Sequence, residues 1–130
     1  MKVVIAFIRN ANDELLTTRR ALNGSYGGYW ELPGGKVEND EQPLNALYRE
    51  LKEELNFHPE HVSYVTTIQL QYEFILFDVG YFQQPLELRA GQLAMEWKTI
   101  EELDFSQFPP SNKLIFDAWS QSLNSNHSNF

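Results

Sequence analysis

The chain lacks several features that would each point to a particular class of protein. It contains no cysteine, which excludes disulfide bonds, thiolate metal ligands and a cysteine nucleophile. No apolar run approaches the length that spans a membrane, and the opening MKVVIAFI is too short and too weakly basic for a signal peptide. We therefore expect a cytoplasmic protein with no membrane partner.

Positive charge is also scarce in this sequence. Lysine and arginine together number 10 against 18 aspartates and glutamates, which gives a formal net charge of −8. This balance argues against direct binding to duplex nucleic acid, because such binding needs cations that face the phosphates. A polyphosphate would also be repelled, so a substrate of that kind would need divalent cations to bridge it to the carboxylates.

The composition is that of a single folded domain. Hydrophobic residues make up 42% and aromatic residues 14% of the 130 residues. Strand-like and helical segments are mixed, which predicts an α/β fold with a mixed sheet and a helix on each face. We expect the domain to cover 1–123 and the polar residues 124–130 to form a tail. The predicted strands are 3–9 and 14–18, joined as a hairpin, two strands within 62–82 and one at 94–100, and the last predicted helix is 111–123.

Another predicted helix follows a Pro-Gly-Gly turn at 33–35 and carries both apolar and acidic residues. Asp40 is expected to cap its start, and Pro43 suits its first turn. Asn56 is expected to end it in the left-handed conformation. Four leucines recur at steps of three, four and four and predict one apolar stripe toward the core: Leu44, Leu47, Leu51 and Leu55.

Three glutamates of this helix lie beside the apolar stripe. Glu50, Glu53 and Glu54 occupy positions i, i+3 and i+4, so their side chains project from one face. Like charges at this spacing repel by roughly a few tenths of a kcal/mol per pair, and hard divalent cations such as Mg²⁺ prefer an all-oxygen environment. The alternative is a solvated acidic face, as most acidic helix stripes are. The placement of Glu41 and Arg49 beside the cluster favours a metal site.

At these positions the chain resembles the Nudix hydrolases. Their signature is Gly, five residues, Glu, seven residues, Arg-Glu-hydrophobic, one residue, Glu-Glu, one residue, Gly, hydrophobic. The segments 18–21, 30–38 and 108–112 further resemble MutT-type members, which hydrolyse 8-oxo-dGTP. The resemblance covers nearly the whole chain and implies the Nudix fold, an α/β/α sandwich with a mixed central sheet. The signature positions are Gly35, Glu41, Arg49, Glu50, Leu51, Glu53, Glu54, Asn56 and Phe57, with Asn56 replacing the final glycine.

The resemblance implies a hydrolytic site with bound Mg²⁺, for which Mn²⁺ can substitute. The ions would bridge phosphate oxygens and help to make water a nucleophile. The planar fork of Arg49 is better suited to orienting a carboxylate than to touching substrate. The predicted metal set is Gly34 through its carbonyl, Glu41, Glu50, Glu53 and Glu54, and the predicted catalytic residues are Glu50, Glu53 and Arg49.

Four residues are predicted to contact the nucleotide. By the resemblance, Asn112 would read the edge of the oxidised guanine, and Arg20 would lie beside the base. Asn112 could instead cap the last helix, and Arg20 could be a surface charge. Lys36 would contact either phosphate or solvent, and Leu32 belongs to the predicted substrate-binding segment before the turn.

The catalytic base stays open at this point. MutT-type enzymes often carry a glutamate six residues before a tryptophan, but counting back from Trp97 gives Gly91. Either a shifted loop brings in Glu87, or Glu50 or Glu53 takes the proton.

Three functions are compatible with these residues. The first is a Mg²⁺-dependent nucleoside triphosphate pyrophosphohydrolase that removes 8-oxo-dGTP, so protecting DNA replication from mutation. The second is the same reaction on CTP or a modified dCTP. The third is a non-catalytic Nudix-fold module, which would be expected to lose the signature carboxylates that this chain keeps. The substrate would be a small nucleotide, and the protein a monomer or dimer.

Overall fold

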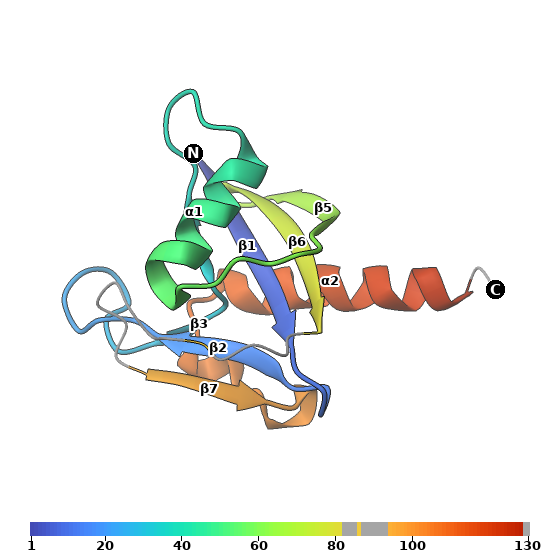
Figure 1. The fold of residues 1–130 in the computed structure, drawn as a ribbon. Helices are drawn as coiled ribbons and strands as arrows, with labels where there is room; N and C mark the ends of the chain where they lie inside the picture. The colour runs from blue at the N-terminus through green and yellow to red at the C-terminus, as the bar shows by residue number, and fades with distance from the viewer. Residues whose placement is uncertain (82–85, 87–93, 129–130) are drawn as a thin grey trace.

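The computed structural model describes residues 1–81, 86 and 94–128 (Figure 1). Among the described residues, four strands precede the first long helix, three more follow it, and a second long helix lies at the C-terminal end. The strands are β1 (Lys2–Arg9), β2 (Leu15–Arg19), β3 (Trp30–Glu31), β4 (Gly34–Lys36), β5 (Ser63–Gln69), β6 (Glu73–Tyr81) and β7 (Ala94–Lys98); the helices are α1 (Pro43–Leu55), α2 (Ser111–Ser128) and the short 3₁₀ helices η1 (Ile100–Glu102) and η2 (Phe105–Gln107).

The strands form one mixed sheet in the order β3-β2-β1-β6-β5, with β4 paired to β1 and β7 paired to β2. β1 and β6 are parallel, from Lys2 opposite Glu73 to Arg9 opposite Tyr81. β1 and β2 form the predicted hairpin, but only Arg9 and Leu15 are in register. The two strands then diverge, so β2 and β7 run across the direction of β1 and β6 in Figure 1.

The core lies on both faces of the sheet, because successive side chains of a strand point to opposite faces. In β1, Val4, Ala6 and Ile8 face α1, whereas Ile5 and Phe7 face α2. The prediction of a helix on each face is therefore confirmed. The α1-side core also contains Leu16, Ala46, Leu47, Leu51, Leu55, Phe57, Ile75, Phe77 and Val79, and the α2-side core also contains Leu15, Leu32, Phe74, Leu76, Ile115, Phe116 and Trp119.

α1 matches the predicted helix with two corrections at its start. Leu44 is 41% exposed and belongs to neither core, because the first turn lies outside the packed stretch, where Ala46 is the first buried residue. Asp40 does not cap the helix: Pro43 sets the first turn, so the cap position falls on Gln42, which makes no side-chain cap hydrogen bond. Asn56 ends the helix with φ 51° and ψ 40°, which confirms the predicted left-handed cap.

The structure also corrects the prediction of a turn at 33–35, because Gly34 and Gly35 begin β4. Glycine has low strand propensity, so the segment reads as a turn from sequence alone. Its backbone nevertheless pairs with β1, with Val4 opposite Gly35 and Ile5 opposite Gly34.

The remaining boundaries follow the predictions more closely. The two strands within 62–82 are β5 and β6, separated by residues 70–72, and the strand predicted at 94–100 is β7, which ends at Lys98. α2 continues to Ser128 instead of ending at Leu123, so the predicted tail is helical through that residue. In the part of the chain that the structure describes, no helix is long and apolar enough to cross a membrane.

Candidate active site

Two glycines allow β4 to lie against both β1 and α1. Gly34 has φ 151°, and a Cβ atom there would overlap the carbonyl group of Val4. A Cβ atom on Gly35 would overlap the carboxylate of Glu50. The absence of side chains at these two positions therefore brings the backbone of β4 onto the acidic flank of α1.

Arg49 lies at the centre of that flank. Its Nε and Nη2 donate to the two oxygens of Glu41 at 2.8 and 3.0 Å, and its Nη1 donates to Glu50 at 2.9 Å. Glu53 accepts from the same Nη1 at 3.4 Å, and Glu38 lies 3.7 Å from it. The fork of Arg49 thus holds Glu41 with two hydrogen bonds and still reaches three other carboxylates.

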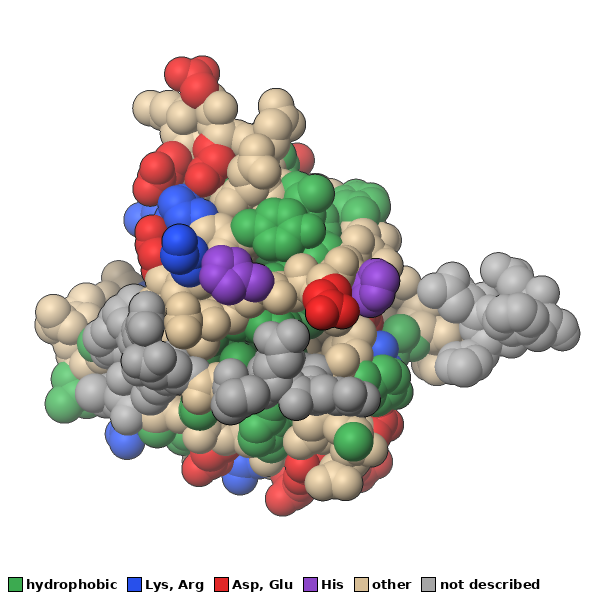
Figure 2. All heavy atoms as spheres, viewed as in Figure 1, with side chains coloured by type: hydrophobic (Ala, Val, Ile, Leu, Met, Phe, Trp, Pro, Cys, Tyr) green, Lys and Arg blue, Asp and Glu red, His purple; other side chains and the backbone are tan. Residues whose placement is uncertain are grey.

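These contacts also fasten the segment before α1. Arg49 Nη2 donates to the carbonyl of Lys36 at 2.9 Å, and the backbone N–H of Glu38 donates to Glu41 at 3.0 Å. Hydrogen bonding to Arg49 lowers the pKa of Glu41 to about 2, and Glu41 in turn raises the pKa of Arg49. Figure 2 shows acidic and basic side chains gathered at this end of the molecule, over α1.

Glu50 and Glu54 form a carboxyl pair that is largely withdrawn from solvent. Glu54 is only 5% exposed. Burial raises the pKa of Glu54 to about 9, and the neighbouring carboxylates of Glu31 and Glu50 add to the shift. Burial also raises the pKa of Glu50, against the opposite effect of Arg49. Oε2 of Glu54 is buried and has no hydrogen-bond partner within the described residues.

The carboxylate oxygens of this site suit a divalent cation, but the described side chains do not converge on one point. Within residues 1–81, 86 and 94–128, no three His, Cys, Asp or Glu side chains are already grouped to hold a metal ion. Glu53 is 53% exposed in its side chain and turns to Arg49. The donors are all oxygens, and Oε2 of Glu54 has no partner among the described residues while burial raises the pKa of this carboxyl, which is chemistry that suits a bound cation. The predicted ligand set stays a prediction.

Arg20 is connected to this cluster by Glu31, a residue that the sequence did not single out as part of the site. Arg20 Nη1 donates to Glu31 at 2.9 Å, and Glu31 is close enough to Glu54 to raise its pKa. The pairing of β2 with β3 brings Arg20 and Glu31 together, because Thr18 and Glu31 are opposite each other in register. Glu31 could have been noticed as a carboxylate directly before the Leu-Pro-Gly-Gly segment, but only the pairing of β3 shows its direction.

Asn112 and Leu32 lie on the α2 side of the sheet. Asn112 is the second residue of α2 and is 7% exposed, and its Oδ1 has no partner within the described residues. It therefore does not occupy the cap position before the helix, which was the alternative reading. Leu32 is 4% exposed within the α2-side core. The side chain of Lys36 is exposed, and its backbone carbonyl accepts a hydrogen bond from Arg49.

A separate cavity of about 310 Å³ lies between β2, β3, β7 and the 3₁₀ helices. Its lining includes Trp30, Phe108 and the carboxylates of Glu96, Glu102 and Asp104. None of the predicted metal or substrate residues lines it. Because the predicted metal and substrate residues lie elsewhere, we do not place the reaction in this cavity.

Glu87, the candidate for a loop base, and Gly91, which stands where that glutamate is expected, lie outside the described residues. Trp97, from which they were counted, packs against the α1-side core. The assignment of the base therefore stays a prediction.

Comparison with known proteins identifies the family. The NUDIX domain model matches residues 1–118. The 8-oxo-dGTP diphosphatase of Escherichia coli (strain K12) is 33% identical over 121 residues, covering 88% of this chain and 92% of that protein. The CTP pyrophosphohydrolase of the same strain is 39% identical over 66 residues, covering 51% of this chain and 49% of that protein. The MutT protein of Methanosarcina mazei Go1 has a similar structure, with a TM-score of 0.76 and 28% identity over 97% of this chain and 94% of that chain.

The chain therefore belongs to the Nudix family. It is a Nudix pyrophosphohydrolase, a hydrolase that acts on acid anhydrides, and the fold predicted from the sequence is confirmed. Nudix hydrolases act on small nucleotide substrates and generally use a divalent metal, typically Mg²⁺.

Proposed function

We propose that this protein uses Mg²⁺ to hydrolyse 8-oxo-dGTP to 8-oxo-dGMP and pyrophosphate. The observation that carries the proposal is the buried, unpartnered oxygen of Glu54 beside Glu50 and the Arg49 cluster. A purely solvated acidic face would leave its carboxylates in water, because burying one without a cation costs free energy. The flank is instead built to receive positive charge.

The residues of α1 and β4 divide the work of the reaction. A bound Mg²⁺ would supply positive charge that offsets the charge of the phosphates and would make the attacking water more acidic. Glu50, Glu53 and Glu54 would hold the metal, and Arg49 keeps Glu50 in position through a hydrogen bond. Water attacks the inner phosphorus, the P–O bond to the departing pyrophosphate breaks, and the water proton passes to Glu50 or Glu53.

Asn112 provides the proposed preference for the oxidised base. Oxidation of guanine converts N7 from an acceptor into an N–H donor, and Oδ1 of Asn112 is a buried acceptor without a partner. The site would then prefer the base that supplies this donor, since unoxidised guanine leaves the acceptor unpaired. Arg20 would lie beside the base, and its hydrogen bond to Glu31 connects it to the carboxyl pair, because Glu31 is close enough to Glu54 to raise its pKa.

A substrate panel tests the base preference. We expect kcat/KM for 8-oxo-dGTP to exceed that for dGTP, CTP and dCTP by at least about tenfold in Mg²⁺. The match to a CTP pyrophosphohydrolase makes CTP or a modified dCTP the second candidate. A maximum at CTP or dCTP would replace the first proposal with the second.

Replacing Glu53 with glutamine tests the metal chemistry. The amide keeps the shape of the side chain but removes the charge, so kcat should fall by roughly a hundredfold or more. Glu60→Gln is the matched control, because Glu60 is exposed and lies outside α1. If no nucleotide is cleaved with Mg²⁺ or Mn²⁺, the protein is the non-catalytic module and the proposal is wrong.

Replacing Asn112 with alanine separates recognition from chemistry. We expect the 8-oxo-dGTP to dGTP ratio of kcat/KM to fall by roughly tenfold while kcat for dGTP is kept, because the metal residues lie on another element. An equal loss toward both substrates would contradict the role of Asn112.

A further inference from the structure

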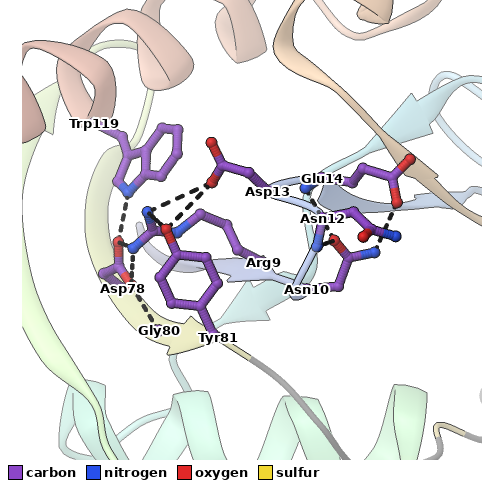
Figure 3. Close-up of polar contacts among 9 residues, drawn as sticks. All are labelled: Arg9, Asn10, Asn12, Asp13, Glu14, Asp78, Gly80, Tyr81 and Trp119. Carbon is purple, nitrogen blue, oxygen red and sulfur yellow. Dashed lines mark hydrogen bonds and ion pairs between the residues drawn. The ribbon is translucent and has the colours of Figure 1, made fainter.

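A second arginine–carboxylate cluster lies where β1 and β6 end (Figure 3). At its centre, Asp78 of β6 accepts hydrogen bonds from three parts of the chain. Trp119 Nε1 donates to Oδ2 at 2.9 Å, the backbone N–H of Gly80 donates to Oδ1 at 2.6 Å, and Arg9 Nη2 lies 3.3 and 3.5 Å from the two oxygens. Figure 3 shows these side chains pointing toward one another from α2, β1 and β6.

Trp119 is held in this cluster by both stacking and a directional bond. It is 1% exposed, and its ring stacks on Phe7 at a centroid distance of 4.6 Å with 3° between the planes. The guanidinium of Arg9 lies over two aromatic rings of this cluster. It is 4.4 Å from the centroid of the Tyr81 ring and 5.6 Å from that of the Trp119 ring. Stacked rings tolerate sliding, whereas the 2.9 Å hydrogen bond to Asp78 permits only a narrow range of positions.

Trp119 and Asn112 lie on the same face of α2. Asn112, Ile115, Phe116 and Trp119 follow the spacing of one helical stripe, and all four are buried. About two turns of a continuous helix separate Asn112 from Trp119, so a rotation or slide of the helix at Trp119 moves Asn112 as well. The apolar residues between them give the helix affinity for the sheet but little directional restraint.

We propose that the hydrogen bond between Asp78 and Trp119 positions Asn112 and so sets base discrimination without any contact to substrate. Asp78 and Trp119 are positioning residues in this account, and the inference rests on the proposed function, in which Asn112 reads the base. Arg9 and the N–H of Gly80 hold Asp78 in the orientation that receives the indole.

Trp119→Phe tests the inference because it keeps an aromatic ring against Phe7 and removes the donor, together with some of the ring volume. We expect KM for 8-oxo-dGTP to rise about tenfold, equivalent to about 1.4 kcal/mol, with kcat within about twofold, so that the ratio of kcat/KM for 8-oxo-dGTP over dGTP falls. In the Asn112→Ala background, the same substitution should change KM by less than about twofold, because the group it positions is gone. Additive effects of the two substitutions would overturn the inference.

Val79→Ala is the matched control for lost stability. Val79 neighbours Asp78 in β6 but belongs to the α1-side core, so its truncation weakens the fold without touching the hydrogen bond. We expect a lower Tm and an unchanged ratio of kcat/KM for 8-oxo-dGTP over dGTP. If Val79→Ala lost as much discrimination as Trp119→Phe, general destabilisation would explain both results and the inference would be overturned.

A measurement without substrate separates this inference from the proposed function. The side-chain amide signal of Asn112 in ¹H–¹⁵N spectra, assigned by its loss in Asn112→Ala, should shift in Trp119→Phe and stay in place in Val79→Ala. An unmoved signal in Trp119→Phe would overturn the positioning role. If the signal moves but the wild-type protein does not prefer 8-oxo-dGTP, then the substrate assignment is wrong and the positioning of Asn112 stands.

Discussion

The clusters around Arg9 and Arg49 are both built from an arginine and carboxylates, yet their charges balance differently. Arg9 meets the partly buried Asp78, which also accepts from an indole and a backbone N–H, and lies 4.0 Å from the exposed Asp13. Arg49 is shared by four glutamates, while Glu54 beside it is buried with an unpartnered oxygen. A balanced cluster of this kind holds elements together. The surplus of carboxylate beside Arg49, with Glu54 buried, is instead the feature on which the proposed cation site rests.

The strongest test of this contrast is Arg49→Lys. Lysine keeps the positive charge but loses the planar fork that holds Glu41 through two bonds while reaching Glu50. We expect kcat to fall by roughly a hundredfold, because misplaced metal ligands cost rate steeply. Steady-state kinetics would show it, with the exposed Lys52→Gln on the same helix as the control. Unchanged kinetics in Arg49→Lys would mean that charge alone matters.

The second test uses the pH dependence of stability without metal. The folded pKa of Glu54 is about 9 against an ordinary 4.5, so between these values the folded protein binds a proton that the unfolded chain has lost. The contribution of Glu54 is therefore fully present below about pH 4.5 and is lost as the pH rises toward 9, by at most about 1.4 kcal/mol per pH unit.

Glu54→Gln should remove this decline, since the amide cannot ionise. Urea unfolding at about pH 5, 7 and 9 would compare the two proteins. Added Mg²⁺ should stabilise the wild-type protein most at high pH, where the proton is most easily displaced, and should stabilise the variant less. Parallel pH profiles for the two proteins would contradict the raised pKa.

The third test concerns the cluster around Arg9 and Asp78. Arg9→Met removes the charge beside Asp78 and should lower the free energy of unfolding by about 2 kcal/mol, because a partly buried carboxylate loses its partner. Calorimetric titration should give an unchanged Mg²⁺ affinity, since Arg9 has no contact with α1 among the described hydrogen bonds and ion pairs. Weaker Mg²⁺ binding would show that the two clusters are not independent.

Most of α1 could be predicted because helix geometry is local. The spacing of Leu47, Leu51 and Leu55 predicts the buried stripe, and the spacing of Glu50, Glu53 and Glu54 predicts the acidic flank. The predictions were wrong where contacts with distant parts of the chain decide burial or secondary structure. Leu44 has the right spacing but no packed surface opposite it, and Gly34 with Gly35 reads as a turn although β1 is available to pair with them.

The contacts that sequence reasoning missed all join distant segments. Glu31 approaches Glu54 because β3 pairs with β2, and the hydrogen bond between Asp78 and Trp119 joins residues far apart in the chain. Neither pair follows from a periodic pattern, because strand order and register depend on which strands pair across the whole domain.

The amino-acid sequence by itself determined which acids share a helix face and how the helix ends at Asn56, since backbone periodicity and a residue's own conformational preference set both. The tertiary structure decided which of those acids is buried without a partner, and where α2 places Asn112 against the sheet. Burial and long-range hydrogen bonds depend on the packing of several elements at once, and no single stretch of the chain contains that information.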